Sequence, residues 1–437
     1  MHKLFPLLLV ALAPPLIAAQ QQTWNADAIN APQVWRVARG ANVNVVVIDT
    51  GLDFNHEDLK PAFAGGYNTI DPAQPAFDDN RHGTHVAGII AAADNDLGIK
   101  GIAPAVKLWG VKIFDAQGVG TEENVIAALN WIIEQKAARG GNWIANMSFS
   151  DESPMSAAGV DAIRHAYAAG ILLVAASGIA TSTVGYPAAL PEVISVGAVD
   201  INDKRPDISA YGPGLLLVAP GVEVMSLVTT NSVPASTLKI DGEFAMRVRI
   251  VAGSHRVPLT ARMIDCGSGR ENEFPATVRG GIALVQRSEL TFTQQVRNAM
   301  NAGAIGVVIA NSDESGIARW ALDEGNSWPA VGAITNLDGA IARRHSGEIV
   351  TLTIRCDDYG RLTGTSQAAP HVSAAAALLW SLKPSATPQE LREVLIETAR
   401  DLGPPGYDIE YGNGLIDVNA AARMLAPESF ESGRRRP

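Results

Sequence analysis

Three short segments of this 437-residue chain each carry one side chain of the kind used in nucleophilic catalysis. VVVIDTGLD places Asp49 at the end of an apolar run, HGTHVAGI begins with His82, and GTSQAAPH contains Ser366. A serine hydroxyl is a weak nucleophile near neutral pH, so it needs a base within hydrogen-bond reach. That base in turn needs a carboxylate that fixes its tautomer and stabilises its charged form. His85 follows three residues after His82, but without a nearby glutamate the pair lacks the pattern of a zinc protease.

The settings of these residues, and their order Asp, His, Ser, resemble those of the subtilisin-type serine proteases (peptidase S8). The resemblance implies a serine endopeptidase that hydrolyses peptide bonds through an acyl-enzyme on Ser366. His82 would act as the base, and Asp49 would orient the imidazole. The backbone N–H of Ser366 and the hydroxyl of Thr365 would stabilise the oxyanion. Gln367 stands where the family often carries methionine, so no oxidisable thioether lies beside the nucleophile.

One position departs from the family pattern. In ILLVAASGIATSTVGYP, Ile179 stands where subtilisin relatives have an asparagine whose amide donates to the oxyanion. Isoleucine cannot donate, and losing one such donor costs about 10²–10³ in rate. We expect impaired hydrolysis unless Thr181, Ser182 or Thr183 takes over; alternatively, a loop deletion displaces the alignment. A catalytically weak or silent binding protein is therefore the second functional hypothesis.

The resemblance also indicates which residues would hold the substrate. They are Ser148, Phe149, Ser150 and Gly178. Ser150 stands where relatives often have glycine, so its side chain would narrow the pocket for P1, the substrate residue before the scissile bond. No acidic residue is evident in the pocket-lining segments, which favours an apolar or broad P1 preference.

A structural calcium ion is a further implication of the resemblance. Asp58 and the loop of residues 93–99 correspond to the family's high-affinity site. The predicted ligands are Asp58, Ala93, Asn95, Leu97 and Ile99. Carboxylate, amide and backbone oxygens suit this hard cation, and Gln22 is a further candidate ligand. A polar turn that binds no metal is the alternative.

The elements that must position these residues follow from the hydrophobic pattern. Apolar runs without polar alternation predict buried strands at 42–49, 107–114, 142–149, 171–177, 192–199 and 215–221. Helix-like segments lie at 82–93, 121–140 and 155–170, and another begins at Ser366. This alternation predicts an α/β fold with a mostly parallel sheet flanked by helices, as in subtilisins. Asp49 would lie at the carboxyl end of its strand, where open α/β sheets place their sites.

The alternation is interrupted between about residues 226 and 356. GGIALVQRSELTF, an amphipathic helix and the strand AIGVVIAN resemble the protease-associated domain, a smaller α+β or β-rich module. The catalytic domain would then be discontinuous, with residues 20–225 and 357–425, and residues 426–437 would form a flexible tail. The insert is interpreted either as a recognition module for substrate or partner or as a structural lid or spacer. In the binding-protein hypothesis the scaffold presents this insert to a partner.

Composition and the amino terminus indicate the setting. The formal net charge of −11 disfavours nucleic acid as a partner and leaves protein or peptide substrates. Residues 1–19 combine a weakly positive start with a short, proline-interrupted apolar stretch, which indicates a signal peptide rather than a membrane anchor. We therefore expect a secreted protein, either extracellular or periplasmic. The family's prosegment is not evident before TWNADAINAPQVW, so either folding needs none or the sequence is incomplete.

The chain has two cysteines, Cys266 and Cys356. In an exported protein a disulfide between them is expected, and free buried thiols are the alternative.

Overall fold

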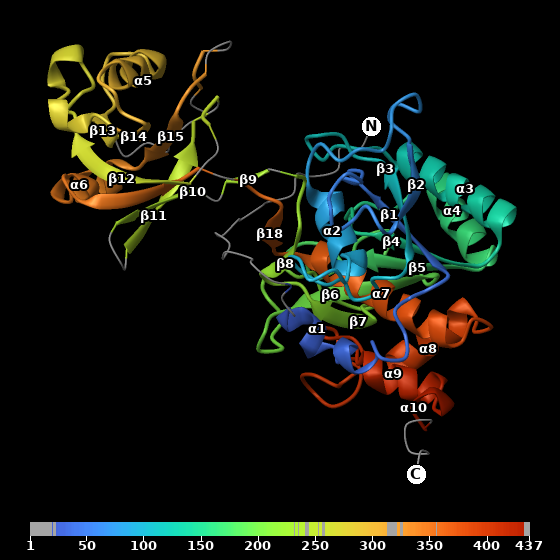
Figure 1. Cartoon of the computed structure of the whole chain (residues 1–437). Helices are drawn as coiled ribbons and strands as arrows, with labels where there is room; N and C mark the ends of the chain where they lie inside the picture. The colour runs from blue at the N-terminus through green and yellow to red at the C-terminus, as the bar shows by residue number, and fades with distance from the viewer. Residues whose placement is uncertain are drawn as a thin grey trace. The chain divides into compact units, whose positions relative to one another are not determined.

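The computed structural model describes residues 20, 23–230, 232–234, 236–240, 244–251, 253–255, 258–312, 321–323, 327–354 and 356–431. The chain forms two compact units: unit 1 contains residues 1–230 and 358–437, and unit 2 contains residues 231–357 (Figure 1). The predicted signal peptide, residues 1–19, and Gln22 lie outside the described residues. Within the described residues, no helix is long and apolar enough to cross a membrane.

Unit 1 is built on a seven-stranded sheet in which all neighbouring strands are parallel. In sheet order the strands are β2 (Phe63–Asn68), β3 (Lys107–Lys112), β1 (Val43–Asp49), β4 (Asn142–Met147), β5 (Ile171–Ala176), β6 (Val193–Val199) and β7 (Leu217–Pro220). The central strands are buried along nearly their whole length, as expected of a sheet covered on both faces. The predicted subtilisin-like α/β fold with a central parallel sheet is confirmed.

Helices cover both faces of this sheet. Helix α7 (Thr365–Leu382) packs across β1 and β4 to β7 and against α2 (His82–Ala91). On the other face, α3 (Glu122–Arg139) and α4 (Ala157–Ala168) pack against each other (Figure 1). Residues 365–380 of α7 are all buried, which identifies α7 as the central helix of the unit. The alanines of α7 allow this close packing because they add little volume between helix and sheet.

Short elements complete unit 1. They are α1 (Trp24–Ala28), η1 (Ala31–Gln33), α8 (Pro388–Glu397), α9 (Val418–Leu425) and α10 (Glu428–Glu431), the last of which falls within the predicted tail. Strand β8 (Val224–Leu227) leads toward unit 2 and pairs antiparallel with β18 (Tyr359–Leu362), on which the chain returns. A Cβ atom on Gly88 of α2 would lie 2.4 Å from Ser226 Oγ, so only glycine lets α2 approach β8 this closely.

The described residues of unit 2 form a closed barrel with two α-helices. Its strands, in barrel order, are β10 (Ser236–Ile240), β11 (Phe244–Ile250), β15 (Ala330–Ile334), β14 (Gly306–Ala310), β13 (Ile282–Gln286), β12 (Pro258–Asp265) and β16 (Ile349–Thr353). The remaining elements are α5 (Phe292–Asn301), α6 (Asn336–Arg344), η2 (Glu271–Glu273), η3 (Ala276–Val278) and the pair β9 (Val233–Pro234) and β17 (Cys356–Asp357).

The Cys266 thiol of unit 2 is free and buried, so this cysteine does not form the expected disulfide; the side chain of Cys356 lies outside the described residues. Its Sγ donates to the Ile264 carbonyl at 3.3 Å, and burial raises its pKa to about 12. Because the thiolate is the reactive form of cysteine, a thiol in this setting is inert near neutral pH.

Candidate active site

Asp49 and His82 form a buried hydrogen-bonded pair. Asp49 is the last residue of β1 and His82 the first of α2, and His82 Nδ1 lies 2.8 Å from Asp49 Oδ1. Burial lowers the pKa of His82, but the carboxylates of Asp49 and, less strongly, Asp78 raise it by more than burial lowers it. The pKa of His82 is therefore above its ordinary value. Donation from Nδ1 leaves Nε2 as the acceptor of the neutral ring, and Nε2 has no hydrogen-bond partner among the described residues.

Ser366 lies in the first turn of α7, the helix that packs against α2. Side chains at the end of β4 and just after it hold this turn in place: Ser148 Oγ donates to the Ser366 carbonyl at 2.8 Å and accepts from Asn146 Nδ2 at 2.9 Å. Asn146 Oδ1 in turn accepts from Ser373 Oγ of α7 at 2.8 Å. The predicted substrate residue Ser148 is thus buried beneath the nucleophile's turn, where it positions the backbone of Ser366.

Asp78, which the sequence analysis did not single out, ties the elements of Asp49 and His82 together. Its carboxylate accepts hydrogen bonds from the hydroxyls of Thr50 and Thr84 and from the backbone N–H groups of Asn80, Arg81 and Thr84. Thr50 directly follows Asp49, and Thr84 lies in the first turn of α2. Burial raises the pKa of Asp78 even though these hydrogen bonds lower it.

A buried lysine, Lys112, holds the chain just after β1 through hydrogen bonds. Lys112 Nζ donates to the Thr50 and Phe114 carbonyls at 2.7 Å and 2.8 Å, and to Asp79 Oδ1 at 2.7 Å. Lys112 falls within a predicted apolar strand. The sequence does not show that Lys112 pairs with Asp49 in the register of β3 and β1.

The predicted oxyanion side carries fewer available donors than the family pattern implies. Thr365 Oγ1 donates to the Gly178 carbonyl at 3.0 Å and accepts from Gly178 N at 3.3 Å, so its proton is already engaged. The apolar side chain of Ile179 is 51% exposed. Thr181 Oγ1 donates to the Thr183 carbonyl at 2.8 Å and closes its own loop.

The predicted substrate strand continues from β4. Phe149 packs edge-on against Phe114, with ring centroids 5.4 Å apart. Ser150 lies between two glycines: a Cβ atom on Gly178 would lie 3.0 Å from Ser150 Oγ, and one on Gly185 would lie 3.1 Å from Ser150 Cβ. The Ser150 side chain therefore occupies the space that these glycines leave open.

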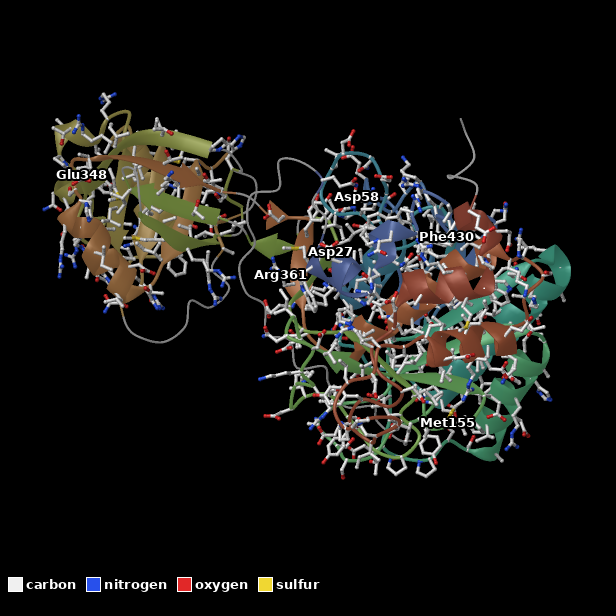
Figure 2. All side chains as sticks on the ribbon, turned by 90° about the horizontal axis from the view of Figure 1, so that it is seen from below. Asp27, Asp58, Met155, Glu348, Arg361 and Phe430 are labelled. Atoms are coloured by element: carbon white, nitrogen blue, oxygen red, sulfur yellow. The ribbon has the colours of Figure 1, made fainter. Side chains whose placement is uncertain are left out.

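A hollow lies beside this strand. Its lining residues are Glu122, Val125, Phe149, Asp151, Ser153, Pro154, Met155 (labelled in Figure 2), Tyr186 and Pro187. The lining is mainly apolar, but two carboxylate residues contribute to it.

The predicted metal loop closes around a glutamine. Gln20 Nε2 donates to the carbonyls of Ala93 at 2.7 Å, Leu97 at 3.3 Å and Ile99 at 3.3 Å, so three predicted ligand oxygens converge on one point. Asp58 (labelled in Figure 2) is buried beside this loop and accepts from Asn95 Nδ2 and Tyr359 Oη, each at 2.8 Å. Burial raises the pKa of Asp58.

These residues fit a hard cation. Rotating the Gln20 carboxamide by half a turn would turn its oxygen toward the point where the three carbonyls meet, and the same rotation of Asn95 would turn its oxygen toward Asp58, so oxygen would be the only donor type. The described residues contain no group of three or more His, Cys, Asp or Glu side chains placed to hold a metal, but this set requires only one carboxylate.

Comparison with known proteins gives one consistent result. The sequence model of the Subtilase family matches residues 40–252 and 294–414, more than half of the chain. Subtilisin DY of Bacillus licheniformis is 41% identical over 199 residues, which cover 44% of this chain and 70% of that protein. Subtilisin BL of Lederbergia lenta is 38% identical over 239 residues, or 54% of this chain and 83% of that protein.

A solved structure is similar along almost the whole chain. The psychrophilic subtilisin-like protease Apa1 from Pseudoalteromonas sp. AS-11 aligns with 94% of this chain and 99% of its own, at 26% identity and a TM-score of 0.61. The family match and these relatives, together with the parallel sheet that places Asp49 beside His82, lead to one conclusion: this chain belongs to the subtilase family of serine endopeptidases.

Proposed function

We propose that this protein is an active endopeptidase that cleaves peptide bonds through an acyl-enzyme on Ser366. Ser366 Oγ attacks the substrate carbonyl while His82 Nε2 takes the hydroxyl proton and then delivers it to the leaving amine. Asp49 holds the ring and stabilises its charged form. The observation that carries the proposal is the buried 2.8 Å hydrogen bond between Asp49 and His82, with Nε2 left unpartnered among the described residues.

A fluorophosphonate probe tests this proposal, because it reacts only with an activated serine. The purified full chain is expected to be labelled, and a Ser366→Ala variant is not. If folded protein with the native sequence resists the probe, the chain is instead a silent scaffold that presents unit 2 to a partner. The apolar residue Ile179 at the oxyanion side is the observation that favours this second function.

We further propose a preference for small, apolar P1 residues and a reduced rate compared with relatives that carry asparagine at the position of Ile179. The first is supported by Ser150, which fills the space between Gly178 and Gly185. The second is supported by the absence of a donor on Ile179.

We also propose a bound calcium ion, a recognition role for unit 2 and secretion of the protein. Calcium would be held by Asp58, Asn95, the carbonyls of the 93–99 loop and Gln20, and its role would be to hold that loop closed. The barrel of residues 231–357 would be a protease-associated module that recognises substrate or a partner. Secretion is supported by the apolar stretch in residues 1–19.

A further inference from the structure

Gln367, the residue after the nucleophile, carries an unpaired buried amide. The side chain is only 1% exposed, and Nε2 has no hydrogen-bond partner in the described part of the chain. Buried polar groups are almost always hydrogen-bonded, because desolvating an N–H group without a partner costs stability. Because no hydrogen bond of Nε2 holds the carboxamide in this orientation, the group is free to turn about its last side-chain bond.

The carboxamide folds back over the start of α7. The position that a Cβ atom on Gly364 would occupy lies 3.0 Å from Gln367 Oε1 and 3.7 Å from Ser366 N. Gly364 is the residue before the helix, so this point lies at the end where unpaired N–H groups favour negative charge. A half-turn of the carboxamide places its NH₂ group near that point, close to the Ser366 N–H.

Among the described residues, the two side chains at the family's oxyanion positions give no free donor to pair with this N–H. Ile179 has no polar atom in its side chain, and the Thr365 hydroxyl donates to the Gly178 carbonyl. When Ser366 Oγ bonds to the substrate carbonyl carbon, the π electrons move onto the oxygen, and that oxygen then needs two hydrogen bonds.

We propose that Gln367 is a catalytic residue whose side-chain N–H donates to the oxyanion in place of the amide that Ile179 lacks. This inference rests on the proposed hydrolytic function. The Ser366 N–H gives the first hydrogen bond and Gln367 Nε2 gives the second, formed when the bound substrate brings its oxygen to the start of α7. No bond to Gln367 is made or broken, and only its proton is shared.

A double-mutant cycle on the full chain tests the proposal, with a peptidyl-alanine p-nitroanilide as substrate. Gln367→Leu removes the donor at similar volume and is expected to lower kcat by about 10²–10³ with little change in KM. Ile179→Asn restores a donor from the other side, so it is expected to recover most of that loss in the Gln367→Leu background. In the native background, the same substitution is expected to raise kcat by less than tenfold.

Two results would overturn the proposal. One is a kcat of Gln367→Leu within about threefold of the native value; the other is a low kcat that Ile179→Asn does not recover, since Gln367 would then act through packing. Gln367→Met gives a second variant that lacks the donor if the leucine variant does not fold, and circular dichroism checks the folding of each. If the native chain itself resists the fluorophosphonate probe, the proposed function fails together with this inference; if only the cycle fails, hydrolysis stands.

Discussion

The Thr50 hydroxyl donates to Asp78 Oδ1 at 2.9 Å and accepts from Gly83 N at the same distance. Thr50 directly follows Asp49, and Gly83 directly follows His82. A single hydroxyl thus connects the strand end that carries the acid to the helix start that carries the base. Asp78 completes the connection, because it also accepts from the Thr84 side chain and backbone in the first turn of α2.

Replacing Asp78 by asparagine is therefore expected to impair catalysis without abolishing substrate binding. The amide turns an NH₂ group toward groups that are themselves donors, so α2 shifts relative to β1. A shift of this kind lowers kcat by about 10- to 100-fold. The charge on Asp78 also raises the pKa of His82, so the acid limb of kcat/KM is expected to move to lower pH.

Steady-state kinetics across pH measure both effects. The titratable and charged residues beside Asp78 and His82 include Asp49, Asp79, Arg81, His85 and Lys112. Thr50→Val serves as the matched variant, since it removes the connecting hydroxyl but keeps the charge. It should lower kcat and leave the acid limb in place. A kcat and a pH profile of Asp78→Asn that both equal those of the native chain would exclude this role.

Substituting Ser150 by glycine is expected to widen the P1 preference. Ser150 occupies the space beside Gly178 and Gly185, so removing its side chain makes room for a larger residue. The ratio of kcat/KM for a phenylalanine over an alanine P1 substrate should rise by about tenfold, the scale of discrimination for a small change in an apolar pocket. Ser182→Gly, at an exposed position of a neighbouring loop, is the control. An unchanged ratio would place the P1 side chain elsewhere.

Calcium is expected to raise the melting temperature of the protein, and a chelator is expected to lower it. At a free concentration of 100 times Kd, binding to the folded state alone adds about 2.7 kcal/mol to the free energy of unfolding. Gln20→Leu and Asp58→Asn should weaken this response, whereas Asp96→Asn, at an exposed position in the same loop, should preserve it. Scanning calorimetry with and without calcium makes the measurement. Identical curves would favour a metal-free polar turn.

Acid is expected to destabilise the protein below about pH 6.5 through two buried histidines. Burial lowers the pKa of His85 to about 3 and that of His371 to about 4. The unfolded chain then binds more protons than the folded chain, so stability present above pH 6.5 is lost as pH falls toward those values. The slope is at most about 1.4 kcal/mol per pH unit for each histidine.

His82 acts in the opposite sense. Its pKa is raised in the folded state, so its contribution is full below pH 6.5 and is lost as pH rises through the folded value. Urea unfolding at a series of pH values measures the sum of the contributions of these three histidines to the free energy of unfolding. A His371→Gln variant should show a shallower acid slope, and His165→Gln, at an exposed position of α4, should match the native chain. Equal slopes in all three would refute the assignment to buried histidines.

Most of unit 1 was predictable because its strands are buried on both faces and so read as unbroken apolar runs. Strand β2 was not, since FAGGYN contains two glycines and alternates between partly exposed and exposed residues, with only Asn68 buried. The helix that begins at Glu122 was predictable from its cap: Thr121 Oγ1 accepts from Asn124 N at 3.4 Å.

The connections within the site were less accessible to sequence reasoning. Motifs identify Asp49, His82 and Ser366 by their local setting, but Asp78 and Lys112 act through partners that only the fold brings close. The glutamine at the predicted calcium site shows a second limit of sequence reasoning. Residues 20–22 are three consecutive glutamines, and composition alone does not distinguish Gln20, which reaches the 93–99 loop, from Gln22.

The discontinuity of unit 1 also sets the order in which the enzyme is completed during synthesis. Asp49 and His82 leave the ribosome well before unit 2, whereas Ser366 and α7 follow it. Because α7 is the helix around which the sheet packs, a growing chain lacks both its nucleophile and its central support until the whole of unit 2 has been made. A truncation between α2 and α7 therefore yields a product that has Asp49 and His82 but lacks the proposed nucleophile.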